Sequence, residues 1–164
     1  MPGPESDFDA LRDDVRQVYD GDPWHSSSIT ATLKDVDART AARRSIPNAH
    51  TIWELVLHMA GWTREVASRV RGADAGDPAE DWPKQPATPT DKEWTAAQDD
   101  LRAAHEELVR ALDSLTPADL VRIVRDQRAS RETGRTVGTH IRGLLNHHTY
   151  HQGQIAVLKK AATS

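Results

Sequence analysis

Four stretches of the chain carry apolar residues at helical spacing, and each is bounded by residues that begin or end helices. The predicted helices span Asp7 to about Tyr19, Ala49 to Arg71, Asp91 to about Leu115, and Thr136 to Ala162. Their apolar residues recur every three or four positions, so each helix has one side suited to burial against a neighbour. In the second stretch this stripe consists of Ile52, Leu55, Val56, Met59, Trp62, Val66 and Val70.

Polar residues with capping chemistry precede these stretches and set their expected starts. We expect Ser6 to cap the first helix and Asn48 the second, because both side chains accept hydrogen bonds from free backbone N–H groups. Thr90 and Glu93 match a capping box for the third. Two short helices are also predicted, one from Ile29 to Val36 and one beginning at Pro117.

Two segments are predicted to be loops. Residues 73–89 contain repeated glycine and proline, which exclude a long helix, and Trp82 is their one large apolar side chain. A connection of this length either covers a pocket or crosses the surface with Trp82 pinned to the core. Residues 125–136 are rich in arginine and are expected to be a solvated loop, with an anchor for an anionic substrate as the alternative.

The absence of any strand pattern makes the fold class all-α, and four main helices with several apolar stripes predict a four-helix bundle. The chain has 164 residues, of which 37% are hydrophobic. This length and composition suit one soluble globular domain spanning residues 1–164.

Composition excludes several kinds of function. The chain has no cysteine, so disulfides, thiolate ligands and a protein thiol nucleophile are ruled out. Its formal net charge of -4 argues against nucleic acid as a partner. No apolar run is long enough to cross a membrane, and no signal peptide is visible, so we expect a cytoplasmic protein.

Histidines supply the candidate chemistry. His147 and His151 are four residues apart in the last predicted helix, one turn apart on the same side. His58 lies in the second predicted helix, so a bundle can bring it to the other two. Three imidazoles would form an open metal site with a position left for water or substrate. His148 competes with His147 as a ligand, and histidines that bind no metal are the alternative.

Three further residues lie within one or two turns of a candidate ligand and could support such a site. Glu54 and Glu65 are candidate general bases, and Gln154 could orient a ligand. Imidazole ligands suit zinc or nickel, with iron or manganese as alternatives, so the sequence does not select the metal.

Two blocks of sequence resemble a known family. Residues 49–62 resemble the second-helix motif of the DinB/YfiT superfamily, in its DinB-like branch. Residues 146–161 resemble the closing helix of that branch, with the pattern H-x-x-Y-H-x-G-Q-I-A beginning at His147. The Asp81-Trp82-Pro83 loop is also similar.

This resemblance implies an up-down-down-up bundle that is commonly a homodimer, with a divalent transition metal on His58, His147 and His151. The family often has Asp or another polar residue at position 148, so His148 is a departure that could bind metal or act as a base. The implied function is a metal-dependent S-transferase acting on a small molecule with a low-molecular-weight thiol such as bacillithiol or mycothiol. The alternatives are a metal-dependent hydrolase and a non-enzymatic, stress-related metal-binding protein.

Overall fold

The structure is a computed structural model that describes residues 3–24, 26–126 and 134–163. Within these ranges the regular elements are helices, and the strand-like pairing consists of isolated bridges between Ala75 and Asp126 and between Ile123 and Thr136. The elements are α1 (Pro4–Asp20), α2 (Ile29–Leu33), α3 (Ala38–Ala42), α4 (Ile52–Val70), α5 (Asp91–Asp113), the 3-10 helix η1 (Pro117–Val121) and α6 (Val137–Thr163).

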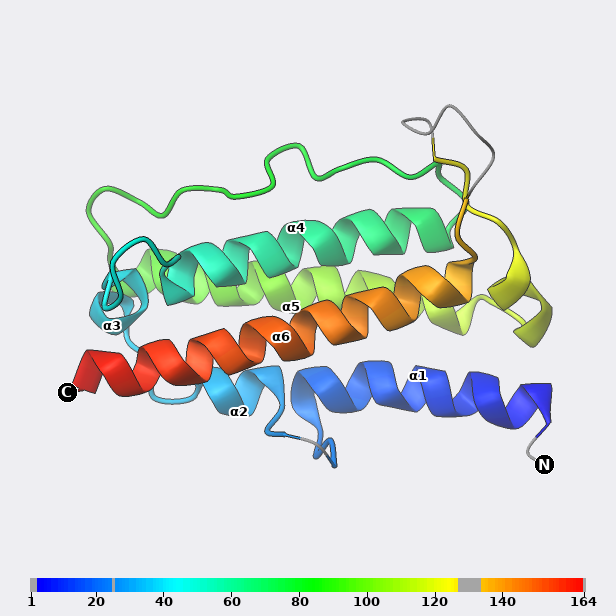
Figure 1. The fold of residues 1–164 in the computed structure, drawn as a ribbon, viewed down its shortest axis with the longest axis horizontal. Coiled ribbons are helices and arrows are strands. Elements are labelled where there is room, and N and C mark those ends of the chain that lie inside the picture. The colour runs from blue at the N-terminus through cyan, green and yellow to red at the C-terminus, as the bar shows by residue number, and fades with distance from the viewer. Residues whose placement is uncertain (1–2, 25, 127–133, 164) are drawn as a thin grey trace.

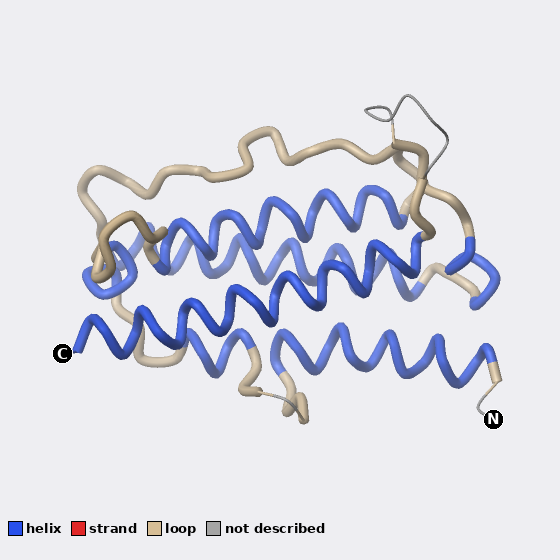
Figure 2. Tube along the Cα trace, viewed as in Figure 1, coloured by secondary structure: helices blue, strands red, loops and turns tan. Residues whose placement is uncertain are grey.

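The four long helices, α1, α4, α5 and α6, form the predicted bundle (Figures 1 and 2). Helices α4 and α5 run in the same direction, opposite to α1 and α6, which is an up-down-down-up arrangement. Two parallel neighbours need a connection that returns along the whole bundle. Residues 71–90 make that crossover and lie along α4 (Figure 1).

The core lies around α4, which packs against both α5 and α6. Its predicted apolar stripe is buried except at Trp62, which is half-buried, and Leu55 and Met59 are each at most 1% exposed. Trp53, which lies outside that stripe, is also 1% exposed. Trp94 of α5 packs against Trp53 and donates its indole N–H to the carbonyl oxygen of Val36, at 2.7 Å. Burial of these large side chains is the main term that holds the helices together.

Several predicted helix ends were wrong, although the helices themselves are confirmed. Helix α1 begins at Pro4, so Ser6 lies inside it and does not cap it. Helix α4 begins after Thr51, and Asn48 instead adopts a positive φ of 63° in the preceding turn. The short helix α2 ends at Leu33, three residues early, because Asp35 also has a positive φ.

Two other local features bear on these predictions. Helix α3, capped by the Asp37 side chain, was not predicted. The capping box of Thr90 and Glu93 is confirmed at the start of α5. In the described part of the chain, no helix combines the length and apolar character needed to cross a membrane.

Candidate metal centre

Three histidines from two helices converge on one point. His58 lies on α4, and His147 and His151 lie one turn apart on α6. The Nε2 atom of His147 is 2.9 Å from Nε2 of His58 and 2.9 Å from Nε2 of His151. The three residues form a cluster that could hold a metal ion, as their spacing in the sequence predicted.

The outer nitrogens of the two flanking imidazoles fix their tautomers. His58 Nδ1 donates to the carbonyl oxygen of Asp81 at 2.6 Å, and His151 Nδ1 donates to Oε1 of Gln154 at 2.6 Å. Each Nε2 therefore presents a lone pair to the centre. The role expected of Gln154 agrees with this geometry.

The donor set fits a cation. His58 and His151 carry their protons on Nδ1, so among the three facing Nε2 atoms only that of His147 can carry a proton. That one N–H can donate a hydrogen bond to His58 or to His151, but not to both. If His147 instead carries its proton on Nδ1, that atom is buried without a hydrogen-bond partner among the described residues. A metal ion that accepts all three lone pairs is the arrangement that satisfies them together.

The electrostatics favour the neutral imidazoles that metals bind. Burial lowers the pKa of His147 to about 4, with smaller contributions from His151 and His58. Burial also lowers the pKa of His151. Protons therefore compete weakly for these nitrogens near neutral pH.

Trp82 of the crossover covers the cluster. Its ring is stacked between two imidazoles, 3.6 Å from the ring centre of His50 and 3.8 Å from that of His58. Trp62 donates its indole N–H to Oδ1 of Asp81 at 2.7 Å, which holds the same loop against α4. Both sequence interpretations of Trp82 are thus correct, because the residue is packed inward and covers the site.

A pocket of about 500 Å³ opens beside the cluster. His58 and His147 line one end, so a ligand in this pocket can reach the histidine nitrogens. Its walls include Trp62, Val66, Trp82 and Leu144. Arg69, Arg135 and His140 line the part farther from the cluster.

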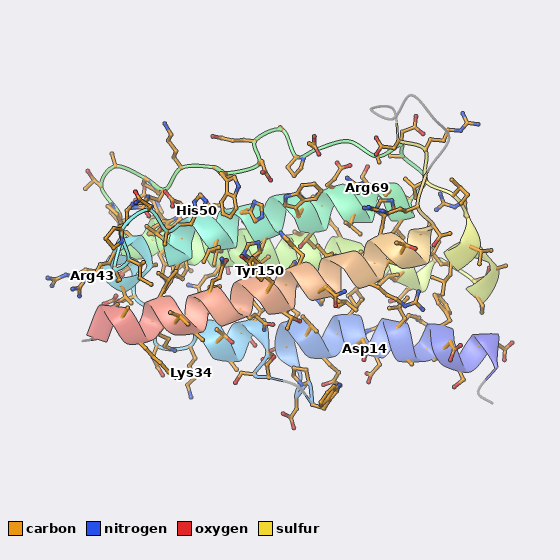
Figure 3. All side chains as sticks on the ribbon, in the orientation of Figure 1. Asp14, Lys34, Arg43, His50, Arg69 and Tyr150 are labelled. Atoms are coloured by element: carbon orange, nitrogen blue, oxygen red, sulfur yellow. The ribbon has the colours of Figure 1, made fainter. Side chains whose placement is uncertain are left out.

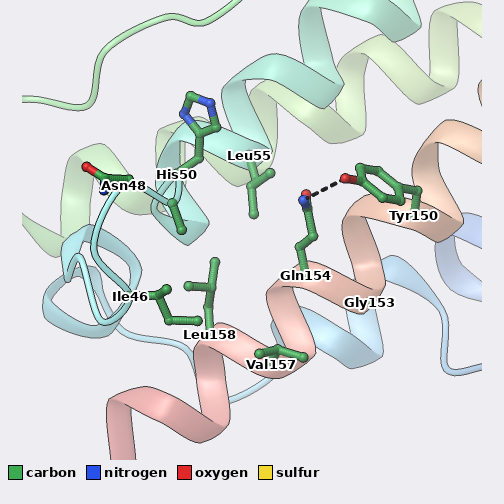
Figure 4. Close-up of a pocket in the computed structure, with 10 residues that line it drawn as sticks. Ile46, Asn48, His50, Leu55, Tyr150, Gly153, Gln154, Val157 and Leu158 are labelled. Atoms are coloured by element: carbon green, nitrogen blue, oxygen red, sulfur yellow. Dashed lines mark hydrogen bonds between the residues drawn. The ribbon is translucent and has the colours of Figure 1, made fainter.

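A second pocket, of about 530 Å³, lies between the start of α4 and the C-terminal half of α6 and is drawn in Figure 4. Its lining includes His50, Tyr150 and Gln154. The amide nitrogen of Gln154 donates to the Tyr150 hydroxyl at 3.2 Å (Figure 4). The amide oxygen of the same side chain accepts from Nδ1 of His151. This pocket therefore borders the residue that orients a ligand and does not include the ligands themselves.

The two glutamates considered as bases make their contacts elsewhere. Glu54 completes the Thr51 capping box and binds Arg44 at 2.8 Å. Burial by itself raises the pKa of Glu54, but the Thr51 backbone N–H and the charge of Arg44 outweigh it and lower that pKa. Glu65 accepts hydrogen bonds from Arg69 and from the backbone N–H of Gly76, which ties α4 to the crossover.

His148 points into the bundle core. It is 3% exposed, and its Nε2 donates at 3.0 Å to the hydroxyl oxygen of Thr63, whose proton goes to the carbonyl of Met59. Burial lowers its pKa to about 3. The structure thus groups His147, and not His148, with His58 and His151.

The remaining histidines lie apart from the cluster. His105 is buried and stacks on Tyr19 with ring centres 4.3 Å apart, although the sequence indicated a surface or capping residue. His140 lines the pocket two turns before His147, and His50 stacks on Trp82. His25 lies outside the described residues.

The sequence reasoning missed Asp81, whose carbonyl holds His58 and whose carboxylate holds Trp62. A backbone acceptor carries no residue-type signal. The available hint was the Asp81-Trp82-Pro83 loop, which marks the point where the crossover meets α4.

Metal-free protein is expected to lose stability as the pH falls from about 6.5 to about 4. Burial lowers the pKa of His105 to about 4, and His147 and His148 behave similarly. In the unfolded state these imidazoles have ordinary pKa values, so the unfolded protein binds more protons than the folded protein in this pH range. We expect the free energy of unfolding in urea to be at least about 2 kcal/mol lower at pH 5 than at pH 7.

A His105→Phe variant provides the control for this prediction, because it removes one buried imidazole that is not part of the cluster and keeps a ring against Tyr19. Its stability should vary less steeply with pH. Equal slopes for both proteins would show that His105 is not the source of the pH dependence.

Comparison with known proteins agrees with this geometry. A family model described as the DinB superfamily matches residues 24–155, which include all three clustered histidines, Asp81 and Trp82. No curated protein and no solved structure matched the chain. Because the family model covers most of the sequence and the fold is an up-down-down-up helical bundle, the chain belongs to the DinB superfamily.

Proposed function

We propose that this protein is a metal-dependent S-transferase that joins a low-molecular-weight thiol to an electrophilic small molecule. The observation that carries the proposal is the convergence of three imidazole Nε2 atoms at the end of a pocket with apolar walls. A divalent metal such as zinc or nickel, held by His58, His147 and His151, would supply a Lewis acid that lowers the pKa of a thiol.

The chain's own groups suit a reaction that needs little proton transfer from the protein. The cosubstrate thiol loses its proton to solvent, its sulfur forms a C–S bond, and the leaving group departs with the electrons of the broken bond. The protein has no cysteine, so the thiol must come from outside. Trp62, Trp82 and Val66 would exclude water around the electrophilic carbon.

A metal-dependent hydrolase is the second candidate, and one observation favours it. Hydrolysis needs a base for water and an acid for the leaving group. Glu54 and Glu65 do not line the pocket and are bound to other partners. The half-exposed carboxylate of Asp81 does line it, with Oδ1 accepting from Trp62 and lying 3.3 Å from Nδ1 of His58. Asp81 would serve as that base.

The test is turnover of a chromogenic aryl chloride by the zinc- or nickel-loaded protein with bacillithiol, mycothiol, coenzyme A or cysteine. We expect at least one thiol to react more than about tenfold faster than in solution, and His58→Ala to abolish the acceleration. His105→Phe, which leaves the pocket intact, should keep it.

Other outcomes separate the alternatives. Hydrolysis of activated esters without thiol, lost in Asp81→Asn, would replace the transferase by the hydrolase. Bound metal without either activity would leave a metal-binding protein and contradict the proposal.

A further inference from the structure

We propose that the end of the pocket remote from the histidine cluster binds an anionic group, a carboxylate or a phosphate, through Arg135 and His140. The substrate would then be an organic anion with an apolar or aromatic body. This inference rests on the proposed function in one respect only, namely that the reacting end of the substrate lies at the cluster.

The distance between the two ends sets the length of the ligand. His140 and His147 both line the pocket and are seven residues apart on α6. At about 1.5 Å per residue, they are about 10 Å apart along the helix axis. The wall between them includes Val66 and Leu144, so the middle of the ligand meets apolar side chains.

Arg69 fixes His140 as a hydrogen-bond donor. Arg69 is 5% exposed, and its guanidinium donates from Nη1 to Nδ1 of His140 at 3.0 Å. Because a guanidinium has no acceptor, Nδ1 must be the acceptor and Nε2 must carry the proton. That N–H has no hydrogen-bond partner among the described residues and is available to a ligand in the pocket.

Arg69 itself is a positioning residue. Its charge is matched by Glu65, to which Nε donates at 2.9 Å, and it also donates to the carbonyl of Gly76. It lies toward the end of α4 remote from His50 (Figure 3). These contacts hold the guanidinium still, so it orients His140 without adding an unpaired charge.

Arg135 supplies the net positive charge. Its side chain is exposed, lines the pocket and has no ion-pair partner within residues 3–24, 26–126 and 134–163. After burial, the charges of Arg69 and Arg135 are the main causes that lower the pKa of His140, and they outweigh Asp126 and Glu65. The electrostatic potential at the His140 ring is therefore positive.

Two other features agree with an anion at this end. Helix α6 begins at Val137, so its positive end faces the region of Arg135 and Thr139. The negative charge that lines the pocket, Asp81, lies at the opposite end, beside His58. An anion bound near Arg135 thus avoids Asp81 and gains from the helix terminus.

The first experiment uses metal-free protein and follows the fluorescence of the pocket tryptophans during titration with octanoate, octyl phosphate and neutral octanamide. We expect the anions to bind several-fold more tightly than octanamide. Arg135→Gln should weaken anion binding about fivefold and leave octanamide unchanged, as for the loss of one exposed ion pair. The two anions separate a carboxylate site from a phosphate site.

Arg142→Gln is the matched control, because Arg142 is an exposed arginine near the start of α6, seven residues after Arg135, that does not line the pocket. Equal binding of anions and octanamide, or equal effects of Arg135→Gln and Arg142→Gln, would overturn the proposal. His140→Phe should also lose the anion preference, and its thermal unfolding shows whether it folds.

The second experiment separates this inference from the proposed function. Cobalt-loaded protein is titrated with 8-mercaptooctanoate and 8-mercaptooctanamide while the sulfur-to-cobalt absorption band is followed. We expect the carboxylate form to bind more tightly, and Arg135→Gln to remove that advantage. Failure to load cobalt or to show the band would contradict the metal-dependent function, whereas the octanoate titration would still decide the anion site.

Discussion

A His147→Ala variant is expected to bind zinc at least about a hundredfold more weakly than the wild type. His147 Nε2 is the atom within 2.9 Å of both other cluster nitrogens, so its loss removes the centre of the donor set. Two histidines on different helices remain, and two ligands do not hold a metal against water and buffer. Competition with a chromophoric chelator measures the change in affinity.

His148→Ala is the matched control, one residue away on the same helix. Its imidazole is bonded to Thr63 in the core, so the variant should lose stability but keep the zinc affinity of the wild type. Retained zinc binding in His147→Ala together with lost binding in His148→Ala would make His148 the ligand and contradict the account of the site.

Trp53→Ala is expected to destabilise the protein by about 3–5 kcal/mol. The side chain is 1% exposed and packs against Trp94 with ring centres 5.1 Å apart, between α4 and α5. Truncation leaves a large cavity that the helices cannot fill without moving. Urea unfolding, with the transition followed by circular dichroism, gives the free energy directly.

Trp24→Ala makes the same chemical change at a side chain that is 97% exposed. We expect it to alter the free energy of unfolding by less than about 0.5 kcal/mol. A similar loss in both variants would mean that the packing of α4 on α5 is not the main source of stability.

The helices were predictable because the apolar residues that recur at helical spacing are the residues that the fold buries. Leu101 and Leu108 in α5, for example, are each 1% exposed, as the pattern requires. The helix ends were less predictable, because several polar residues near each start have capping chemistry. Asn48 and Thr51 both suit an N-cap, and the choice depends on the left-handed turn at Asn48, which only the tertiary structure reveals.

The candidate site was likewise predictable from the sequence only in part. The four-residue spacing of His147 and His151 predicted their shared side, and the bundle fold predicted that His58 could join them. The helical wheel did not separate His147 from His148, because both lie near the buried side of α6. The roles of Glu54 and Glu65 depend on partners distant in sequence, Arg44 and the backbone of Gly76, so their positions on α4 could not reveal them.

The most direct test of the central claim is the metal content of wild-type protein purified without an affinity tag, measured by elemental analysis and combined with X-ray absorption at the metal edge. The account predicts about one transition metal per chain, bound by three imidazole nitrogens. No metal as purified, and none taken up from added zinc or nickel, would contradict it.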